Sequence, residues 1–223
     1  MLPWTLLATA TIPEDGGEMR LYRRGNEFSI RVGAYELMNS RVHGSEDALA
    51  EIVADRLPDP QSASVLIGGL GMGFTLAGML ARVGRRSTVV VSELVPEVIE
   101  WNRGVMAEVN GPALKDARVS VRVGDVAAQI GDAQGAYDAI ILDVDNGPAA
   151  ITARGNARLY SAVGLRAAFD ALREGGTLAV WSAGDDPAFT RRLRRAGFEI
   201  EEHRVRGQKG NRGSRFLIWV ARR

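Results

Sequence analysis

The 223-residue chain contains no cysteine, and only Lys115 and Lys209 among its 28 basic residues are lysines. The lack of cysteine excludes disulfides, thiolate nucleophiles and zinc–thiolate sites, and we expect no metal. The formal net charge is +1, which gives no overall electrostatic basis for binding nucleic acid. No run approaches the roughly 20 apolar residues of a membrane span. We therefore expect a soluble, cytoplasmic protein without a membrane or nucleic-acid partner.

The first part of the chain is rich in hairpin signals. Four short runs of strand-forming residues are separated by Glu-Asp-Gly-Gly, Arg-Gly-Asn and Gly33, as in antiparallel hairpins. We predict a small N-terminal β domain over residues 1–43 and a main domain over residues 44–223. The main domain opens with a predicted helix over residues 45–57, with Ser45 as its N-cap and Pro58 as its stop.

From Val65 onwards, apolar runs alternate with helical segments, one of which is predicted over residues 96–109. Runs such as TVVVSE (88–93) and YDAIILD (137–143) lack period-two alternation, as do strands covered on both faces. Strands that alternate with helices form right-handed crossovers and a parallel sheet. The last 26 residues, 198–223, contain two strands with no room for a helix between them. The predicted fold is α/β: a Rossmann-like, doubly wound, mostly parallel seven-stranded sheet that ends in an antiparallel hairpin.

The stretch VLIGGLGMGFTL (65–76) joins the first of these strands to a helix through several glycines. Such a turn offers free amides and a positive helix end to a ligand, with no Cβ in the way. Gly69, Gly71 and Gly73 give the spacing G-x-G-x-G, whereas the dinucleotide fingerprint requires a glycine in place of Phe74. We predict that these glycines bind a cofactor; a tight turn that serves only helix packing is the alternative.

An acidic residue closes each of the next strands. Glu93 lies about 20 residues after the glycines, where a carboxylate accepts both hydrogen bonds of a ribose diol. Asp125 can accept from an adenine amino group, and Asp143 lies at the mouth of the crevice in which open α/β sheets bind ligands. Any one of these acids could instead cap a helix. Their joint order favours a nucleoside site.

The order of these elements resembles the S-adenosylmethionine-dependent class I methyltransferase superfamily, and residues 19–223 resemble its spermidine synthase (polyamine aminopropyltransferase) family. The similarity is carried by VLIGGLGMG, VSELVPEVIEWNR, ARVSVRVGD, YDAIILDVDNGP and REGGTLAVWSA. It implies S-adenosylmethionine or decarboxylated S-adenosylmethionine as donor, a small amine as acceptor, and a homodimer. Glu93 would hold the ribose and Asp125 the adenine. Asp143 would orient or deprotonate the acceptor amine.

Three departures from the family pattern bear on the reaction. Gly71 stands where the family has an aspartate that clamps the free amine of the decarboxylated donor. The loop Asp143–Pro148 is shorter than the family's, so that Asp145 or Asn146 must replace a second acid. The family's acceptor-binding stretch is here SEDALAE, without its tyrosine and histidine, although His43 lies just upstream. The first departure leaves intact S-adenosylmethionine open as the donor.

Three aromatic residues and one basic segment each allow two interpretations. Tyr160 could cover the acceptor from a lid, or pack in the core. Trp101 could wall the adenine and Trp181 could be a stacking platform, although burial in the core alone would explain both. The basic segment 204–215 could bind an anionic acceptor or RNA, but a solvated hairpin loop is the simpler interpretation.

The sequence thus predicts a spermidine-synthase-like transferase that moves an aminopropyl or methyl group from an S-adenosyl sulfonium to a nucleophile, most simply an amine. A methyltransferase with another acceptor and a non-catalytic nucleoside-binding module are the alternatives. A nicotinamide-dependent dehydrogenase is disfavoured by the glycine spacing and by the lack of a suitable histidine for hydride chemistry.

Overall fold

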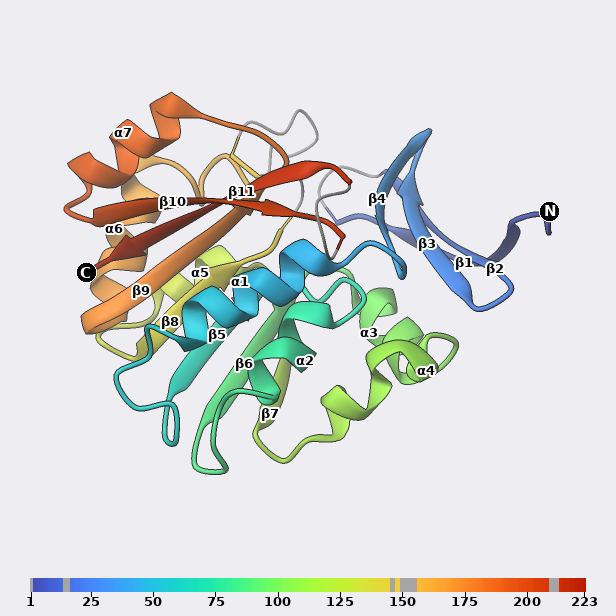
Figure 1. Cartoon of the computed structure of the whole chain (residues 1–223), viewed down its shortest axis with the longest axis horizontal. Coiled ribbons are helices and arrows are strands. Elements are labelled where there is room, and N and C mark those ends of the chain that lie inside the picture. Colours follow the sequence, from blue (N-terminus) through green and yellow to red (C-terminus); the bar gives the residue numbers. More distant parts are fainter. Residues whose placement is uncertain (1, 14–16, 145–146, 149–155, 209–212) are drawn as a thin grey trace.

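The computed structural model describes residues 2–13, 17–144, 147–148, 156–208 and 213–223, and the statements below concern these residues. A seven-stranded sheet forms the centre of the molecule, in the order β10-β11-β9-β8-β5-β6-β7 (Figure 1). Its strands are β5 (Ser64–Gly68), β6 (Thr88–Glu93), β7 (Val119–Val123), β8 (Tyr137–Leu142), β9 (Leu172–Ser182), β10 (Glu199–Arg206) and β11 (Arg215–Arg222).

The pairing within this sheet confirms the predicted fold class. β5 is parallel to β6 and β8, β6 is parallel to β7, and β8 is parallel to β9. β11 lies antiparallel between β9 and β10. The chain order reverses on either side of β5, which makes a crevice at the carboxyl ends of β5 and β8 the expected place for a ligand.

Helices cover both faces of the sheet. One face buries a core with α1 (Gly44–Ala54), α2 (Phe74–Leu80) and α3 (Pro96–Arg103). The other buries a second core with α5 (Val126–Gly131), α6 (Ala162–Ala171) and α7 (Pro187–Arg195). We call these the α1 face and the α6 face. Because both faces are covered, the central strands read as continuous apolar runs.

Some predicted boundaries were wrong. The helix expected over residues 96–109 ends at Arg103, and after Gly104 the chain forms α4 (Ala107–Asn110) and the short 3₁₀ helix Gly111–Lys115. Ser45 is not the N-cap of α1, because the helix begins at Gly44 and His43 occupies the cap position. The edge strand β7 is largely exposed rather than covered on both faces.

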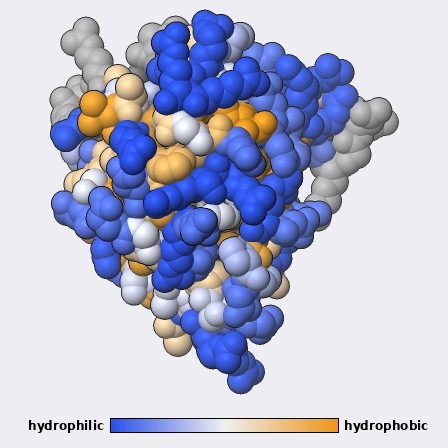
Figure 2. All heavy atoms as spheres, turned by 90° about the vertical axis from the view of Figure 1, so that its left-hand side faces the viewer, coloured by the Kyte–Doolittle hydropathy of each residue, from blue (hydrophilic) through white to orange (hydrophobic). Residues whose placement is uncertain are grey.

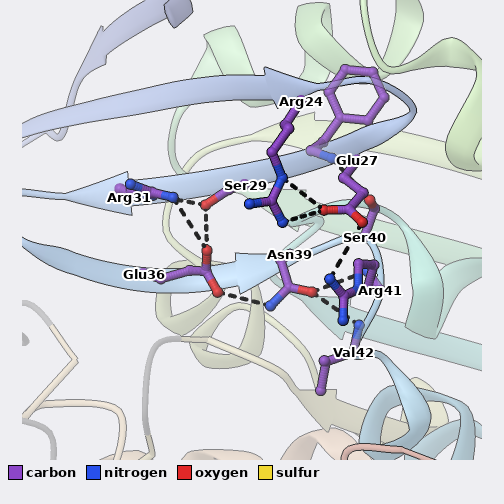
Figure 3. Close-up of polar contacts among 10 residues, drawn as sticks. Arg24, Glu27, Ser29, Arg31, Glu36, Asn39, Ser40, Arg41 and Val42 are labelled. Atoms are coloured by element: carbon purple, nitrogen blue, oxygen red, sulfur yellow. Dashed lines mark hydrogen bonds and ion pairs between the residues drawn. The ribbon is translucent and has the colours of Figure 1, made fainter. Parts of the chain in front are cut away.

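The N-terminal strands form a separate antiparallel sheet in the order β1-β2-β3-β4, from β1 (Thr5–Thr11), β2 (Glu18–Arg24), β3 (Glu27–Val32) and β4 (Tyr35–Asn39). Figure 3 shows polar contacts that tie its strands together. Glu36 on β4 accepts hydrogen bonds from Ser29 and Asn39, while Arg24 pairs with Glu27. These contacts fix β4, which carries Met38 towards the central sheet.

The outer surface is mostly hydrophilic on the side of α6 and α7. Figure 2, which faces the left-hand side of Figure 1, shows hydrophobic residues in small areas between hydrophilic ones. No helix in the described ranges is long and apolar enough to cross a membrane.

Candidate functional site

The glycine turn after β5 has a backbone that only glycine adopts easily. Gly69, Gly71 and Gly73 have φ angles of +88°, +52° and +78°, in the left-handed region. A Cβ on Gly69 would collide with the carbonyl oxygen of Asp143. A Cβ on Gly71 would lie 2.5 Å from Cε of Met38. The glycines therefore allow β8 and the N-terminal sheet to approach this turn.

Two buried or half-buried asparagines hold the same turn from α3 and α4. Asn102 donates from Nδ2 to the carbonyl oxygen of Gly71 at 2.8 Å, and Asn110 donates to that of Met72 at 2.9 Å. Neither residue was predicted from the sequence. Little in the sequence indicates their role, because an asparagine inside a helical segment usually occupies a polar surface position.

Glu93 fastens the glycine turn to the end of β6. Its carboxylate accepts hydrogen bonds from the backbone N–H of Leu70 at 2.8 Å and of Val95 at 2.9 Å. Burial raises the pKa of Glu93, and the backbone hydrogen bonds offset part of that rise. Val123, its register partner on β7, is hydrophobic but 61% exposed. An open apolar surface therefore adjoins the acid predicted to hold the ribose.

Asp125 lies at the exposed end of β7 and caps α5. Its Oδ1 accepts a hydrogen bond from the backbone N–H of Ala127 at 2.8 Å, as the capping alternative expected. Contact with an adenine through the other carboxylate oxygen stays a prediction.

Asp143 follows β8 directly and faces α2. Thr75 in the first turn of α2 donates a hydrogen bond from Oγ1 to Oδ2 of Asp143 at 2.6 Å. Burial raises the pKa of Asp143 to about 7, the nearby carboxylate of Glu46 adds to the rise, and the Thr75 hydrogen bond opposes it. Asp143 is therefore a carboxyl group that titrates near neutral pH.

Glu46 is a further residue that was not predicted from the sequence. It lies in the first turn of α1, is only 8% exposed, and accepts a hydrogen bond from its neighbour Ser45 at 2.5 Å. Burial raises its pKa as well. The stretch SEDALAE had been singled out for the residues it lacks, whereas the structure brings its glutamate to Asp143. We call Glu46 and Asp143 the acidic pair.

Of the three predicted substrate residues and the predicted second acid, the structure describes only His43 and Tyr160. His43, at the start of α1, stacks on Phe74 with ring centroids 4.1 Å apart and planes 5° apart. Its Nδ1 lies 3.2 Å from Asp47 Oδ2 without forming a hydrogen bond. His43 is thus near the acidic pair, because Phe74 adjoins Thr75. Asp145 and Asn146 lie outside the described residues.

Tyr160 lies in the core of the α6 face. It is 4% exposed and packs edge-on against Phe189, with ring centroids 5.5 Å apart. This position favours the core-packing alternative over a lid. A role in covering the acceptor stays a prediction.

The basic hairpin segment is partly neutralised where it is described. Arg204 donates to both carboxylate oxygens of Asp185, at 2.9 and 3.1 Å. Lys209 and Arg212 lie outside the described residues. Among the residues that the structure covers, no cluster of three or more histidines and acids could hold a metal ion.

The strand order, the glycine turn and the acids at successive strand ends define a protein with the Rossmann-like fold of class I methyltransferases. Residues 44–193 match the spermine/spermidine synthase domain. The chain therefore belongs to the spermine/spermidine synthase family.

Known relatives agree with this assignment. The chain is 33% identical to a polyamine aminopropyltransferase of Nitrosomonas europaea over 124 residues, which is 55% of this chain and 35% of the relative. It is 32% identical to a polyamine aminopropyltransferase of Corynebacterium efficiens over 177 residues, 77% of this chain and 30% of the relative. The chain thus spans 30–35% of the length of these curated relatives.

Solved structures support the fold. Spermidine synthase from Thermotoga maritima superposes with a TM-score of 0.75 at 17% identity, covering 97% of this chain and 72% of that protein. A spermidine synthase crystallised with the transition-state analogue AdoDATO gives the same values.

Proposed function

We propose that this protein transfers an aminopropyl group from decarboxylated S-adenosylmethionine to an amine acceptor. The observation that carries the proposal is the acidic pair, which lies beside the glycine turn at the carboxyl end of β8. A buried pair of carboxyl groups favours a cationic or proton-donating partner, since their mutual repulsion falls when one of them gains a proton or a cation.

The donor half of the site fits an adenosyl sulfonium. The glycine turn presents backbone without Cβ atoms to the tail of the nucleoside, which would approach from a side other than that of Met38, the residue next to Gly71. Glu93 supplies a carboxylate for the ribose hydroxyls, with the exposed surface of Val123 next to it for the base. Asp125 has an exposed carboxylate at the adjoining strand end.

The acceptor half fits an amine nucleophile. The amine must lose a proton to attack, and a carboxylate whose pKa lies near the working pH is the most effective base for that task. The nitrogen of the acceptor attacks the carbon attached to sulfur and forms the new C–N bond. The C–S bond breaks, its electron pair stays on a now neutral thioether, and Asp143 takes the proton from nitrogen. Holding the two substrates in line supplies much of the acceleration.

Methyl transfer from intact S-adenosylmethionine is the second candidate. It is favoured by Gly71, where no carboxylate is available to repel a donor carboxylate and where Met38 occupies the space above the turn. In either reaction Asp145 and Asn146 would contribute from the loop after Asp143. A homodimer and a cytoplasmic location are proposed on the family resemblance.

Mass spectrometry of reaction mixtures tests both candidates. The protein is incubated with each of the two donors and a panel of amines. Methylthioadenosine together with an aminopropylated amine supports the first candidate, and S-adenosylhomocysteine with a methylated amine supports the second. The proposal is overturned if neither donor nor methylthioadenosine binds at millimolar concentration in calorimetry.

A further inference from the structure

Trp181 lies next to Asp143 on the neighbouring strand. Leu142 on β8 is the register partner of Val180 on β9, so Asp143 and Trp181 take the next positions along two parallel strands. Leu142 and Val180 both belong to the core of the α6 face. Because side chains alternate along a strand, Asp143 and Trp181 both point to the α1 face, where Trp181 packs on the core.

A continuous apolar surface runs from Trp181 to the start of α1. The Trp181 and Phe216 rings are 4.9 Å apart with planes tilted by 32°. A Cβ on Gly207 would lie 2.7 Å from Val42 and 2.8 Å from Phe216, so these two side chains meet over that glycine. The Gly207 carbonyl accepts from the Gly44 N–H at 2.8 Å. We call Trp181, Phe216 and Val42 the aromatic wall.

The indole N–H of Trp181 is buried and has no hydrogen-bond partner among the residues that the structure covers. Burying such a donor unpaired is destabilising, and a buried tryptophan N–H usually finds a hydrogen-bond partner. The side chain as a whole is only half-buried. An unpaired N–H on a partly exposed ring is what we expect of a side chain that makes further contacts with a bound molecule.

We propose that the aromatic wall is the second half of the acceptor site and selects an amine with an apolar body. The inference rests on the proposed function, since the acidic pair holds the reacting amine and the wall receives the rest of the acceptor. A monoamine therefore binds better than a diamine of the same length. None of the three side chains of the wall is a carboxylate, so a distal ammonium that rests on the wall alone would lose its hydration there. The cation–π attraction of a ring face would replace only part of that hydration.

Steady-state kinetics with 1-aminobutane and 1,4-diaminobutane test this inference. The variants are Trp181→Leu, which removes the ring, and Trp181→Phe, which keeps a ring but removes the N–H. Trp4→Leu is the matched control, because Trp4 lies just before β1 with Arg24 over its ring. We expect the wild type and the control to favour the monoamine in kcat/KM by at least about tenfold, which corresponds to about 1.4 kcal/mol.

In Trp181→Leu the KM for 1-aminobutane rises about tenfold with little change in kcat. In Trp181→Phe the KM for 1-aminobutane lies between that of the wild type and that of Trp181→Leu. An unchanged affinity for methylthioadenosine shows that each variant is folded. A wild-type preference for the diamine, or an unchanged KM in Trp181→Leu, overturns the inference and leaves the proposed function standing. If the wild type binds no sulfonium nucleoside and alkylates neither amine, both fail.

Discussion

The proposed donor half and the proposed acceptor half of the site are built in different ways. The donor half is a backbone structure: three glycines with left-handed φ angles, held by Glu93 and two asparagines through hydrogen bonds to main-chain groups. The acceptor half consists of side chains from α1, β8, β9 and β11, which meet only in the folded chain. A turn can be recognised from consecutive residues of the sequence. Side chains that are brought together only by folding leave no such pattern.

The two halves also differ in their electrostatics. Both Glu93 and the acidic pair are buried enough to raise their pKa values. Several backbone N–H groups stabilise the charged form of Glu93 by hydrogen bonds, as is expected of a carboxylate with a structural role. Asp143 receives one hydrogen bond from Thr75 and faces a second acid. The acceptor half therefore holds the group that is poised to exchange a proton.

Asp143→Asn should have the largest effect, because it removes the proton acceptor and leaves the donor half intact. We expect turnover to fall by about 10²–10⁴, the range for loss of a general base, with unchanged affinity for methylthioadenosine. Single-turnover kinetics and calorimetry measure the two quantities. Asp59→Asn, in an exposed turn before β5, is the control. Equal turnover in Asp143→Asn and the control would remove Asp143 from the mechanism.

Gly71→Asp tests what Met38 does to the donor half. The left-handed φ angle alone is tolerable for aspartate, but the new side chain would meet Met38. We expect the single variant to lose at least about tenfold in nucleoside affinity, or 1.4 kcal/mol. Adding Met38→Ala should restore most of it. Gly131→Asp is the control, because a Cβ there meets no atom within 4 Å. No recovery in the double variant would mean that backbone strain, and not Met38, excludes a side chain.

Glu93→Gln tests the hydrogen bonds of the donor half. The new amide group would turn one N–H donor towards another, so we expect a loss of about 1–3 kcal/mol in the free energy of unfolding. Urea denaturation measures it, with exposed Glu97→Gln as control. A stability equal to the wild type would show that the contacts of Glu93 with Leu70 and Val95 are dispensable.

Glu46→Gln should have the smallest effect but the most specific one. Removing the Glu46 charge makes ionisation of Asp143 easier, so the pKa of Asp143 falls from about 7. The acidic limb of kcat/KM against pH then moves to lower pH, and activity at pH 6 relative to pH 8 rises. A pH profile superimposable on the wild type would show that the two carboxyl groups do not interact.

The sequence predicted the fold well, because strand and helix periodicities are local patterns; it also located the glycine turn, whose binding of a cofactor stays a prediction. It misplaced the N-cap of α1 and the end of α3, since helix ends depend on contacts with the rest of the chain. It named Asp143 from its position after β8. It did not name Glu46 or settle Trp181, because both depend on how α1 and the C-terminal hairpin pack on the sheet.

The central claim is that the acidic pair binds the acceptor amine. Replacing the pair should therefore weaken binding of the amine and leave binding of the nucleoside unchanged. The most direct measurement is a calorimetric titration of 1-aminobutane into protein saturated with methylthioadenosine, for the wild type and for Glu46→Gln/Asp143→Asn. The account predicts that the double variant binds methylthioadenosine as the wild type does and binds the amine at least about tenfold more weakly. Equal amine affinity in the two proteins would contradict it.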